Sequence, residues 1–321
     1  MICLIQLTRL RKLRKRKTNN MARTQQLALL DEPAHAHGPI VNVASVPQRS
    51  PFRYPGGKTW LAPRIRTWMV SRNTPPDEFV EPFAGGGIVS LTVAFEQLAN
   101  HVTMVELDEC VAAVWQVILD GDAQQLAERI AAFNMTPDTL DAELKVTPNT
   151  RQQLAFQTIL RNRVNHGGIL APGSGKLKLG ENGKGVLSRW YPATLKRRIE
   201  DIMQVRDRIH FIAGDGFEVM RQMMHRQDAV FFIDPPYTAG EKRAGSRLYS
   251  HYEIDHEALF RLTSELAGDF LMTYDNAPEL HLLAHRYGFD AMIVAMKNTH
   301  HAEMTELLIG LNLEWARRPL P

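Results

Sequence analysis

The feature that most constrains the fold of this chain is a regular alternation of short apolar runs with amphipathic stretches. Apolar runs at 77–83 and 101–108 predict strands, and the stretches that follow them, 85–99 and 109–121, predict helices. Strands that alternate with helices through short connections are typical of a parallel sheet covered by helices. The first half of the chain therefore predicts an α/β fold.

The alternation stops after residue 121 and resumes near residue 200. Residues 122–165 have a helical pattern, including 126–133 and 151–164, and residues 166–192 are rich in glycine. Beyond them come predicted strands and helices in turn, at 210–215, 216–226, 229–233, 255–267, 269–275 and 305–311. One α/β domain split by an inserted segment explains this order. We expect a first part at 51–121, the insertion at 122–199 and a second part at 200–315, preceded by a disordered basic tail and linker at 1–50.

The charge distribution and the cysteine content limit the classes of protein to which this chain can belong. The net charge is +3, but residues 1–23 hold eight basic and no acidic residues, which leaves −5 for the remainder. Such a tail can lie along phosphates or an anionic membrane surface, can be a solvated tail, or can be absent if translation starts at Met21. No apolar run is long enough to span a bilayer. Two cysteines predict neither a disulfide framework nor a zinc cluster, and we expect a cytoplasmic protein.

The inserted segment is strongly basic. Between Arg151 and Arg198 there are ten Lys or Arg residues and one acid, Glu181, for a local charge of +9. Its glycines allow a close approach of the backbone to a ligand. A phosphate-binding surface is the favoured interpretation, and a solvated cationic face is the alternative.

Two glycine-containing motifs precede the insertion. In EPFAGGG (81–87) a glycine turn leads from a strand into a helix, and Glu106 follows Gly85 by twenty-one residues. An acid about 20 residues beyond such a turn suits the ribose of a nucleotide-like cofactor, although an ordinary exposed acid is the alternative. In FRYPGGKTW (52–60), Lys58 suits a carboxylate or phosphate. Phe52 stands where a phosphate-binding P-loop ending in Gly57-Lys58-Thr59 needs its first glycine, which excludes an ATPase of that type.

The motif FFIDPPYT (231–238) predicts the reactive site. Pro235 and Pro236 cannot continue a strand, so the strand ends at Asp234, where open α/β sheets place their ligands. The Asp234 carboxylate and the Pro235 carbonyl can both accept hydrogen bonds from one exocyclic amine while Tyr237 stacks on the base that carries it. An electrophilic methyl group held in line would then be transferred to that amine, on a base flipped out of its duplex.

These motifs together resemble a known family. YPGGK (54–58), EPFAGGG, VELD (105–108), IDPPY (233–237) and TELLIG (305–310) match, in order, the motifs of Dam-type DNA adenine N6-methyltransferases of the α group. The resemblance spans about Pro51 to Leu311. It implies a Rossmann-like S-adenosylmethionine-dependent methyltransferase sheet with an inserted, mainly helical target recognition domain.

The resemblance also implies roles for single residues. Asp234, Pro235 and Tyr237 would be catalytic. The expected contacts to S-adenosylmethionine are Tyr54, Lys58, Phe83, Gly85, Glu106, Asp215 and Asp234. Tyr54 stands where the family usually has Trp, and Glu106 where it often has Asp. Among the basic residues of the insertion, the candidates for contact with double-stranded DNA are Arg163, Lys176, Lys178 and Arg189.

Other functions fit parts of the sequence. Methylation of RNA adenine or of a protein amide uses related (D/N/S)PPY sites, but Asp234 and the motif order favour DNA adenine. A non-catalytic DNA-binding relative is the second alternative, which the intact Asp234 and Tyr237 disfavour. A membrane-surface protein lacks the amphipathic face it needs. No metal is expected. The recognition sequence stays open, because RNRVNHGG (161–168) departs from the family pattern after Asn162 and Arg163.

Overall fold

The computed structural model describes residues 41–54, 56–177, 180, 183–236, 254–297 and 303–318. They fall within one of the two compact units into which the chain divides, His37–Pro321. The basic part of the predicted tail and the linker up to residue 40 lie outside the described residues. Residues 41–50, by contrast, are described. Val43–Ser45 form a short 3-10 helix, and Ser50 is buried, with its hydroxyl donating to the Gly86 carbonyl.

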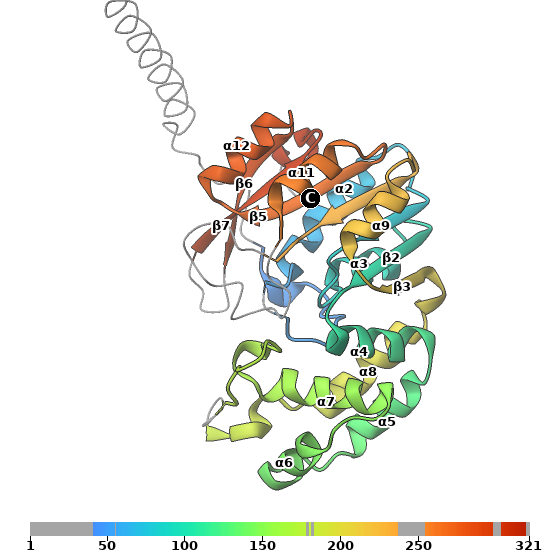
Figure 1. Cartoon of the computed structure of the whole chain (residues 1–321), viewed down its shortest axis with the longest axis vertical. Helices are drawn as coiled ribbons and strands as arrows, with labels where there is room; N and C mark the ends of the chain where they lie inside the picture. The colour runs from blue at the N-terminus through green and yellow to red at the C-terminus, as the bar shows by residue number, and fades with distance from the viewer. Residues whose placement is uncertain are drawn as a thin grey trace, which may run out of the picture. The chain divides into compact units, whose positions relative to one another are not determined.

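A seven-stranded sheet forms the centre of the unit, in the order β3-β2-β1-β4-β5-β7-β6 (Figure 1). Strand β7 is antiparallel to both neighbours, and the other pairings are parallel. The strands are β1 (Glu78–Glu81), β2 (His101–Glu106), β3 (Ile209–Ala213), β4 (Ala229–Ile233), β5 (Asp269–Asp275), β6 (Asp290–Lys297) and β7 (Glu303–Gly310). This order confirms the predicted α/β class and its Rossmann-like sheet.

Two layers of helices cover the sheet. Contacts between helices occur within each layer. Helix α3, which follows β1, packs on α2, and α2 packs on α13, while the helices that follow β3, β4 and β5 pack on one another. Right-handed crossovers explain this separation, because the chain moves outward from β1 to β3 and then back toward β5. The first layer holds α2 (Ala62–Val70), α3 (Ile88–Phe95), α4 (Glu109–Asp120) and α13 (Glu314–Arg317), and the second α9 (Gly216–Met223), α11 (His256–Ser264) and α12 (Pro278–Arg286).

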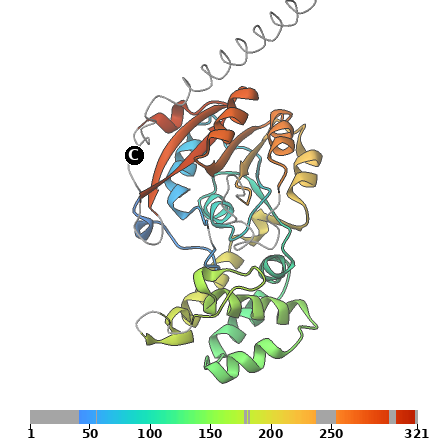
Figure 2. The same cartoon turned by 60° about the vertical axis from the view of Figure 1, so that its left-hand side comes forward.

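A helical segment separates α4 from β3 along the chain. It contains α5 (Ala123–Ala132), α6 (Pro137–Lys145), α7 (Arg151–Val164) and α8 (Pro192–Met203), with short 3-10 helices η3 (His166–Gly168) and η5 (Gly185–Arg189). Figures 1 and 2 show these helices grouped beside α4, away from β5, β6 and β7. Helix α7 packs on α4 and α5 on α8, and the aromatic rings of Phe133, Phe156 and Trp190 meet between them. Apolar burial therefore ties the helical segment to the sheet domain.

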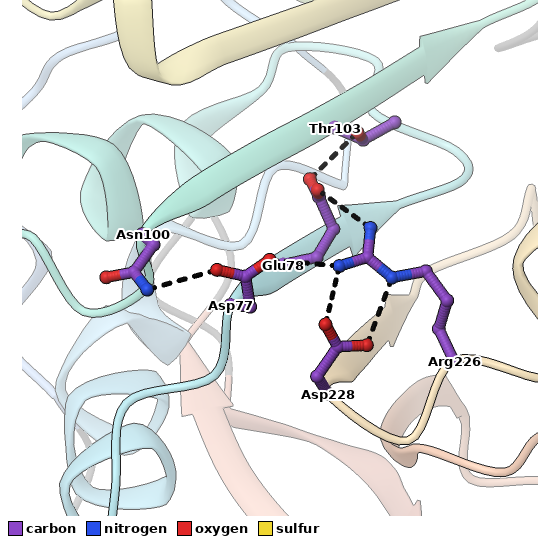
Figure 3. Close-up of polar contacts among 6 residues, drawn as sticks. All are labelled: Asp77, Glu78, Asn100, Thr103, Arg226 and Asp228. Atoms are coloured by element: carbon purple, nitrogen blue, oxygen red, sulfur yellow. Dashed lines mark hydrogen bonds and ion pairs between the residues drawn. The ribbon is translucent and has the colours of Figure 1, made fainter.

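Charged side chains fix the amino ends of β1 and β4. Arg226 lies among three carboxylates, those of Asp77, Glu78 and Asp228, at 3.1, 3.3 and 2.7 Å (Figure 3). Thr103 of β2 donates to Glu78 at 2.9 Å, which extends the network to a third strand. These contacts lie at the opposite end of the strands from the residues with predicted functions.

Most predicted elements match observed ones. The predictions at 151–164 and 269–275 have the bounds of α7 and β5, and the strand predicted at 229–233 is β4. The sequence did not predict helices α2, α8, α12 and α13 or the edge strand β6. Strand β6 pairs with β7 over its whole length, and such pairing between distant segments leaves little trace in local pattern.

Candidate active site

A large cleft opens at the carboxyl ends of β1, β2 and β4. Its volume is about 1970 Å³, and it brings together most of the residues with predicted functions. Those that line it are Tyr54, Lys58, Phe83, Gly85, Glu106, Arg163, Arg189, Asp215, Asp234 and Pro235. Tyr237 and Lys178 lie outside the described residues. The cleft reaches from the sheet to the helical segment, because residues of η3, α7 and α8 form part of its wall.

The glycine turn after β1 forms one wall of this cleft. Gly85 and Gly87 have φ of 50° and 61°, a region that favours glycine. A Cβ atom on Gly85 would lie 2.6 Å from Tyr54 Cε1, so the tyrosine ring is packed directly on the turn. Trp115 Nε1 donates to the Gly85 carbonyl at 2.9 Å, which fixes the turn from α4. The turn leads into the amino end of α3, whose dipole favours polar or anionic groups.

Glu106 ends β2 beside this turn. Its Oε2 accepts from the Gly85 N–H and its Oε1 from the Asp108 N–H, each at 2.8 Å. Burial raises the pKa of Glu106 to about 7. Each carboxylate oxygen can accept more than one hydrogen bond, so the side chain can still receive hydroxyl donors from the cleft.

Asp215 and Phe83 line the same region of the cleft from the ends of β3 and β1, the two strands that flank β2. Asp215 caps the amino end of α9 by accepting from the Phe217 N–H at 2.9 Å. The rings of Phe83 and Phe217 meet edge to face at 6.0 Å between centroids. A Cβ atom on Gly216 would lie 2.2 Å from the Pro82 carbonyl oxygen, so this tight approach of α9 to the turn after β1 requires glycine.

Asp234 lies directly after β4, and two donors hold its carboxylate. Lys58 Nζ lies 2.9 Å from Asp234 Oδ1, and Thr273 Oγ1 of β5 donates to the same oxygen at 2.7 Å. The lysine is 2% exposed, so this ion pair is shielded from water. Lys58, which the resemblance assigned to the cofactor, is thus in direct contact with the predicted catalytic acid. Thr273 was not found from the sequence, because nothing in the pattern of β5 distinguishes it.

Two further acids accompany this pair. Glu306 of β7 places Oε2 3.6 Å from Lys58 Nζ, and burial raises its pKa to about 7. Glu81 ends β1, and burial raises its pKa to about 8, although Ser90 donates to it from both its N–H and its hydroxyl. The sequence analysis gave neither residue a role. A charged residue within an otherwise apolar strand, as in FVEPF and TELLI, is the signal that could have identified them.

The residues predicted to contact DNA lie in different surroundings. Arg163 of α7 is 5% exposed, and its guanidinium donates to the Pro51 carbonyl. Burial, followed by the like charges of Arg198 and Arg53, lowers the pKa of Arg163 to about 9. Lys176 is exposed and forms an ion pair with Asp141 of α6. Arg189 lies at the end of η5 on the wall of the cleft. Contact with DNA stays a prediction for all of them.

Among the described residues, no group of three or more His, Cys, Asp or Glu side chains is arranged to hold a metal ion. No described helix combines the length and the apolar character needed to cross a bilayer.

Comparison with known proteins gives one family match. Residues 54–169 match the model of a family described as D12 class N6 adenine-specific DNA methyltransferase. The matched stretch begins at Tyr54, includes the glycine turn and Glu106, and ends after η3. The match supports a methyltransferase, and the fold is a Rossmann-like methyltransferase fold, which implies S-adenosylmethionine as the methyl donor. No curated protein matches the sequence significantly.

Several solved structures are similar at low identity. A candidate RNA methyltransferase from Pyrococcus horikoshii is 10% identical, with 81% of this chain and 84% of that chain covered and a TM-score of 0.36. A precorrin-8W decarboxylase from Methanobacterium thermoautotrophicum is 11% identical, with 85% and 96% covered and a TM-score of 0.34. A precorrin-6y C5,15-methyltransferase from Geobacter metallireducens is 9% identical, with 77% and 86% covered and a TM-score of 0.32.

Proposed function

We propose that this protein transfers the methyl group of S-adenosylmethionine to the exocyclic N6 amine of adenine in double-stranded DNA. The observation that carries the proposal is that Asp234 and Pro235 of the IDPPY motif share one cleft with the glycine turn and Glu106. The family match over residues 54–169 supports the same reaction. Within this proposal, the protein belongs with the α-group enzymes, and α5 to α8 form the target recognition domain.

The cleft fits the cofactor in size and in chemistry. Ligand pockets commonly have volumes of about 300–1,000 Å³, so a cleft of about 1970 Å³ has room for a nucleoside cofactor and a base side by side. Glu106 offers acceptors for ribose hydroxyls, and the Tyr54 ring and the Gly85 turn offer a flat surface near them. Phe83 and Asp215 would line the nucleoside portion. The bound cofactor would supply an electrophilic methyl group on a sulfonium.

The residues around Asp234 suit the activation of an amine. Its carboxylate and the Pro235 carbonyl would accept hydrogen bonds from the two hydrogens of one amino group, which keeps the nitrogen lone pair available for attack. Lys58 and Thr273 hold Asp234 Oδ1, so the carboxylate does not have to be ordered when the substrate enters. The proton would leave the nitrogen after methyl transfer has made it positive, and Asp234 therefore acts as an acceptor without being a strong base.

The helical segment would meet the DNA. Lys176 is exposed, and Arg189 lies where the cleft wall passes into η5, so both can reach a phosphate backbone beside a flipped base. Lys178 would act with them. Tyr237 would stack on the flipped adenine as an aromatic platform. Both of these last residues lie outside the described part of the chain, and their roles rest on the sequence motifs.

A labelling experiment tests the reaction. Purified wild-type protein, Asp234→Ala and the control Asp207→Ala would be incubated with radiolabelled S-adenosylmethionine and unmethylated genomic DNA, followed by nucleoside analysis. Asp207 is a fully exposed aspartate remote from the cleft. Label in N6-methyladenine with wild type and Asp207→Ala, and none with Asp234→Ala, is the expected result. No label in DNA despite measurable binding of the cofactor would refute the DNA assignment, and a wild type that binds no cofactor would refute the enzyme.

A further inference from the structure

The main chain of residues 50–53 connects the helical segment with the cleft. Asn162 of α7 holds Arg53 at both of its main-chain groups: the Arg53 N–H donates to Asn162 Oδ1 at 2.8 Å, and Asn162 Nδ2 donates to the Arg53 carbonyl at 2.9 Å. The same Nδ2 donates to the Gly168 carbonyl at 2.8 Å. One buried amide therefore joins α7, η3 and the 50–53 segment.

Two arginines hold the preceding carbonyls of the same segment. Arg163 of α7 donates to the Pro51 carbonyl, and Arg198 of α8 donates to the Ser50 carbonyl at 2.9 Å. The backbone of η3 also packs closely here, since a Cβ atom on Gly168 would lie 2.2 Å from the Arg53 carbonyl oxygen. Three side chains of the helical segment, those of Asn162, Arg163 and Arg198, thus fix the path of residues 50–53.

The other side of residues 50–53 contacts the glycine turn, which forms one wall of the proposed cofactor site. The Ser50 hydroxyl donates to the Gly86 carbonyl, and the Phe52 ring packs on Trp115, which itself holds Gly85. Tyr54 follows at once, with its Cβ atom only 2.8 Å from the position of a Cβ on Gly86. Lys58 lies four residues further, in contact with Asp234. A shift of the 50–53 segment would therefore displace both Tyr54 and Lys58.

Arg163 has surroundings that do not suit a contact to DNA phosphate. Its side chain is buried, its guanidinium donates to a main-chain carbonyl, and its charged neighbours are Arg198 and Arg53. Burying a cation among like charges costs stability, so a role in stabilising the fold does not explain its presence. Its direct effect is on the position of the 50–53 segment.

On the basis of the proposed methyltransferase function, we propose that Asn162 and Arg163 are positioning residues of the cofactor site. They fix residues 50–53 and thereby place Tyr54 on the glycine turn and Lys58 beside Asp234. Arg163 is accordingly assigned to cofactor binding through the 50–53 segment and not to the DNA surface.

The test is the affinity for S-adenosylmethionine without DNA, measured by isothermal titration calorimetry for wild type, Arg163→Met, Arg163→Lys and Asn162→Ala. Arg161→Met is the matched control, because Arg161 lies on the same helix and, within the described part of the chain, its hydrogen bond stays on that helix, to Gln157 at 3.2 Å. We expect Arg163→Met and Asn162→Ala to weaken cofactor binding about tenfold or more, the effect of losing one well-placed contact. Arg163→Lys keeps a donor for the Pro51 carbonyl and should restore most of the affinity.

Two further measurements, of Tm and of DNA affinity, separate this role from others. We expect Arg163→Met to keep the Tm and the DNA affinity of wild type, the latter measured by fluorescence anisotropy at fixed salt. Normal cofactor binding with weakened DNA binding would overturn the proposal and restore Arg163 to the DNA surface. A fall in Tm that accounts for the lost binding, with no rescue by lysine, would show a purely structural role. Failure of wild type to bind the cofactor would instead refute the proposed function and, with it, this inference.

Discussion

The buried carboxyl of Glu81 should make the stability of the protein depend on pH, and Glu81→Gln should remove that dependence. Glu81 is 3% exposed at the end of β1, and burial, with the nearby Asp234 charge as a smaller contribution, raises its pKa from 4.5 to about 8. Glutamine has nearly the same shape and can still accept the Ser90 N–H bond, but it does not ionise.

The direction in which stability changes with pH follows from the direction of the Glu81 pKa shift. Between pH 4.5 and about 8 the unfolded chain loses the Glu81 proton while the folded chain keeps it. The contribution of this carboxyl to stability is therefore complete below pH 4.5 and is lost as pH rises through about 8. Each pKa unit corresponds to about 1.4 kcal/mol, so the loss between about pH 5 and about pH 8.5 is on the order of 4 kcal/mol.

Urea denaturation at these two pH values measures the effect. The free energy of unfolding of Glu81→Gln, taken relative to that of wild type, should be higher at about pH 8.5 than at about pH 5, by on the order of 4 kcal/mol. Glu128→Gln is the control, because its carboxyl is exposed on α5. Wild type and Glu81→Gln share every other titrating group. A change with pH in the stability difference between these two proteins is therefore due to Glu81. A difference between Glu81→Gln and wild type that is the same at both pH values would refute the reasoning.

Two further substitutions test the two ends of the sheet. Gly85→Ala should weaken binding of S-adenosylmethionine about tenfold or more, because a Cβ at φ 50° would lie 2.6 Å from the Tyr54 ring. Gly175→Ala is the control in the same calorimetric titration, because a Cβ on Gly175 meets nothing within 4 Å. Equal affinities of the two variants for S-adenosylmethionine would contradict the role of the turn. Arg226→Gln should lower the free energy of unfolding by about 1 kcal/mol, since it breaks a partly exposed charge network, and leave methyl transfer at 25 °C unchanged. Thermal unfolding together with the labelling assay checks this, and a loss of transfer without a loss of stability would contradict it.

The parts of the fold that could be predicted depend on local pattern. The apolar run before Asp234, the glycine turn at 85–87 and the periodicity of 151–164 each determine an element within a few residues, so β4, the turn into α3 and α7 were all expected. The location of the cleft followed as well, because the carboxyl ends of parallel strands meet at one edge of a sheet. Strand β6 was not expected, since its pairing with β7 depends on a partner and not on its own residues.

The sequence by itself determined the fold class and identified Asp234, Glu106 and Gly85, which end strands or form turns at the cleft. Only the tertiary structure decided how side chains far apart in sequence are paired: Lys58 with Asp234 and Glu306, Thr273 with Asp234, and Asn162 with Arg53. The physical reason is that backbone conformation and apolar periodicity are short-range properties, whereas burial, ion pairing and the pKa of a carboxyl depend on which distant segments pack around it. Arg163 illustrates this difference, since a basic residue in a basic segment predicts an exposed cation and the fold buries it against Pro51.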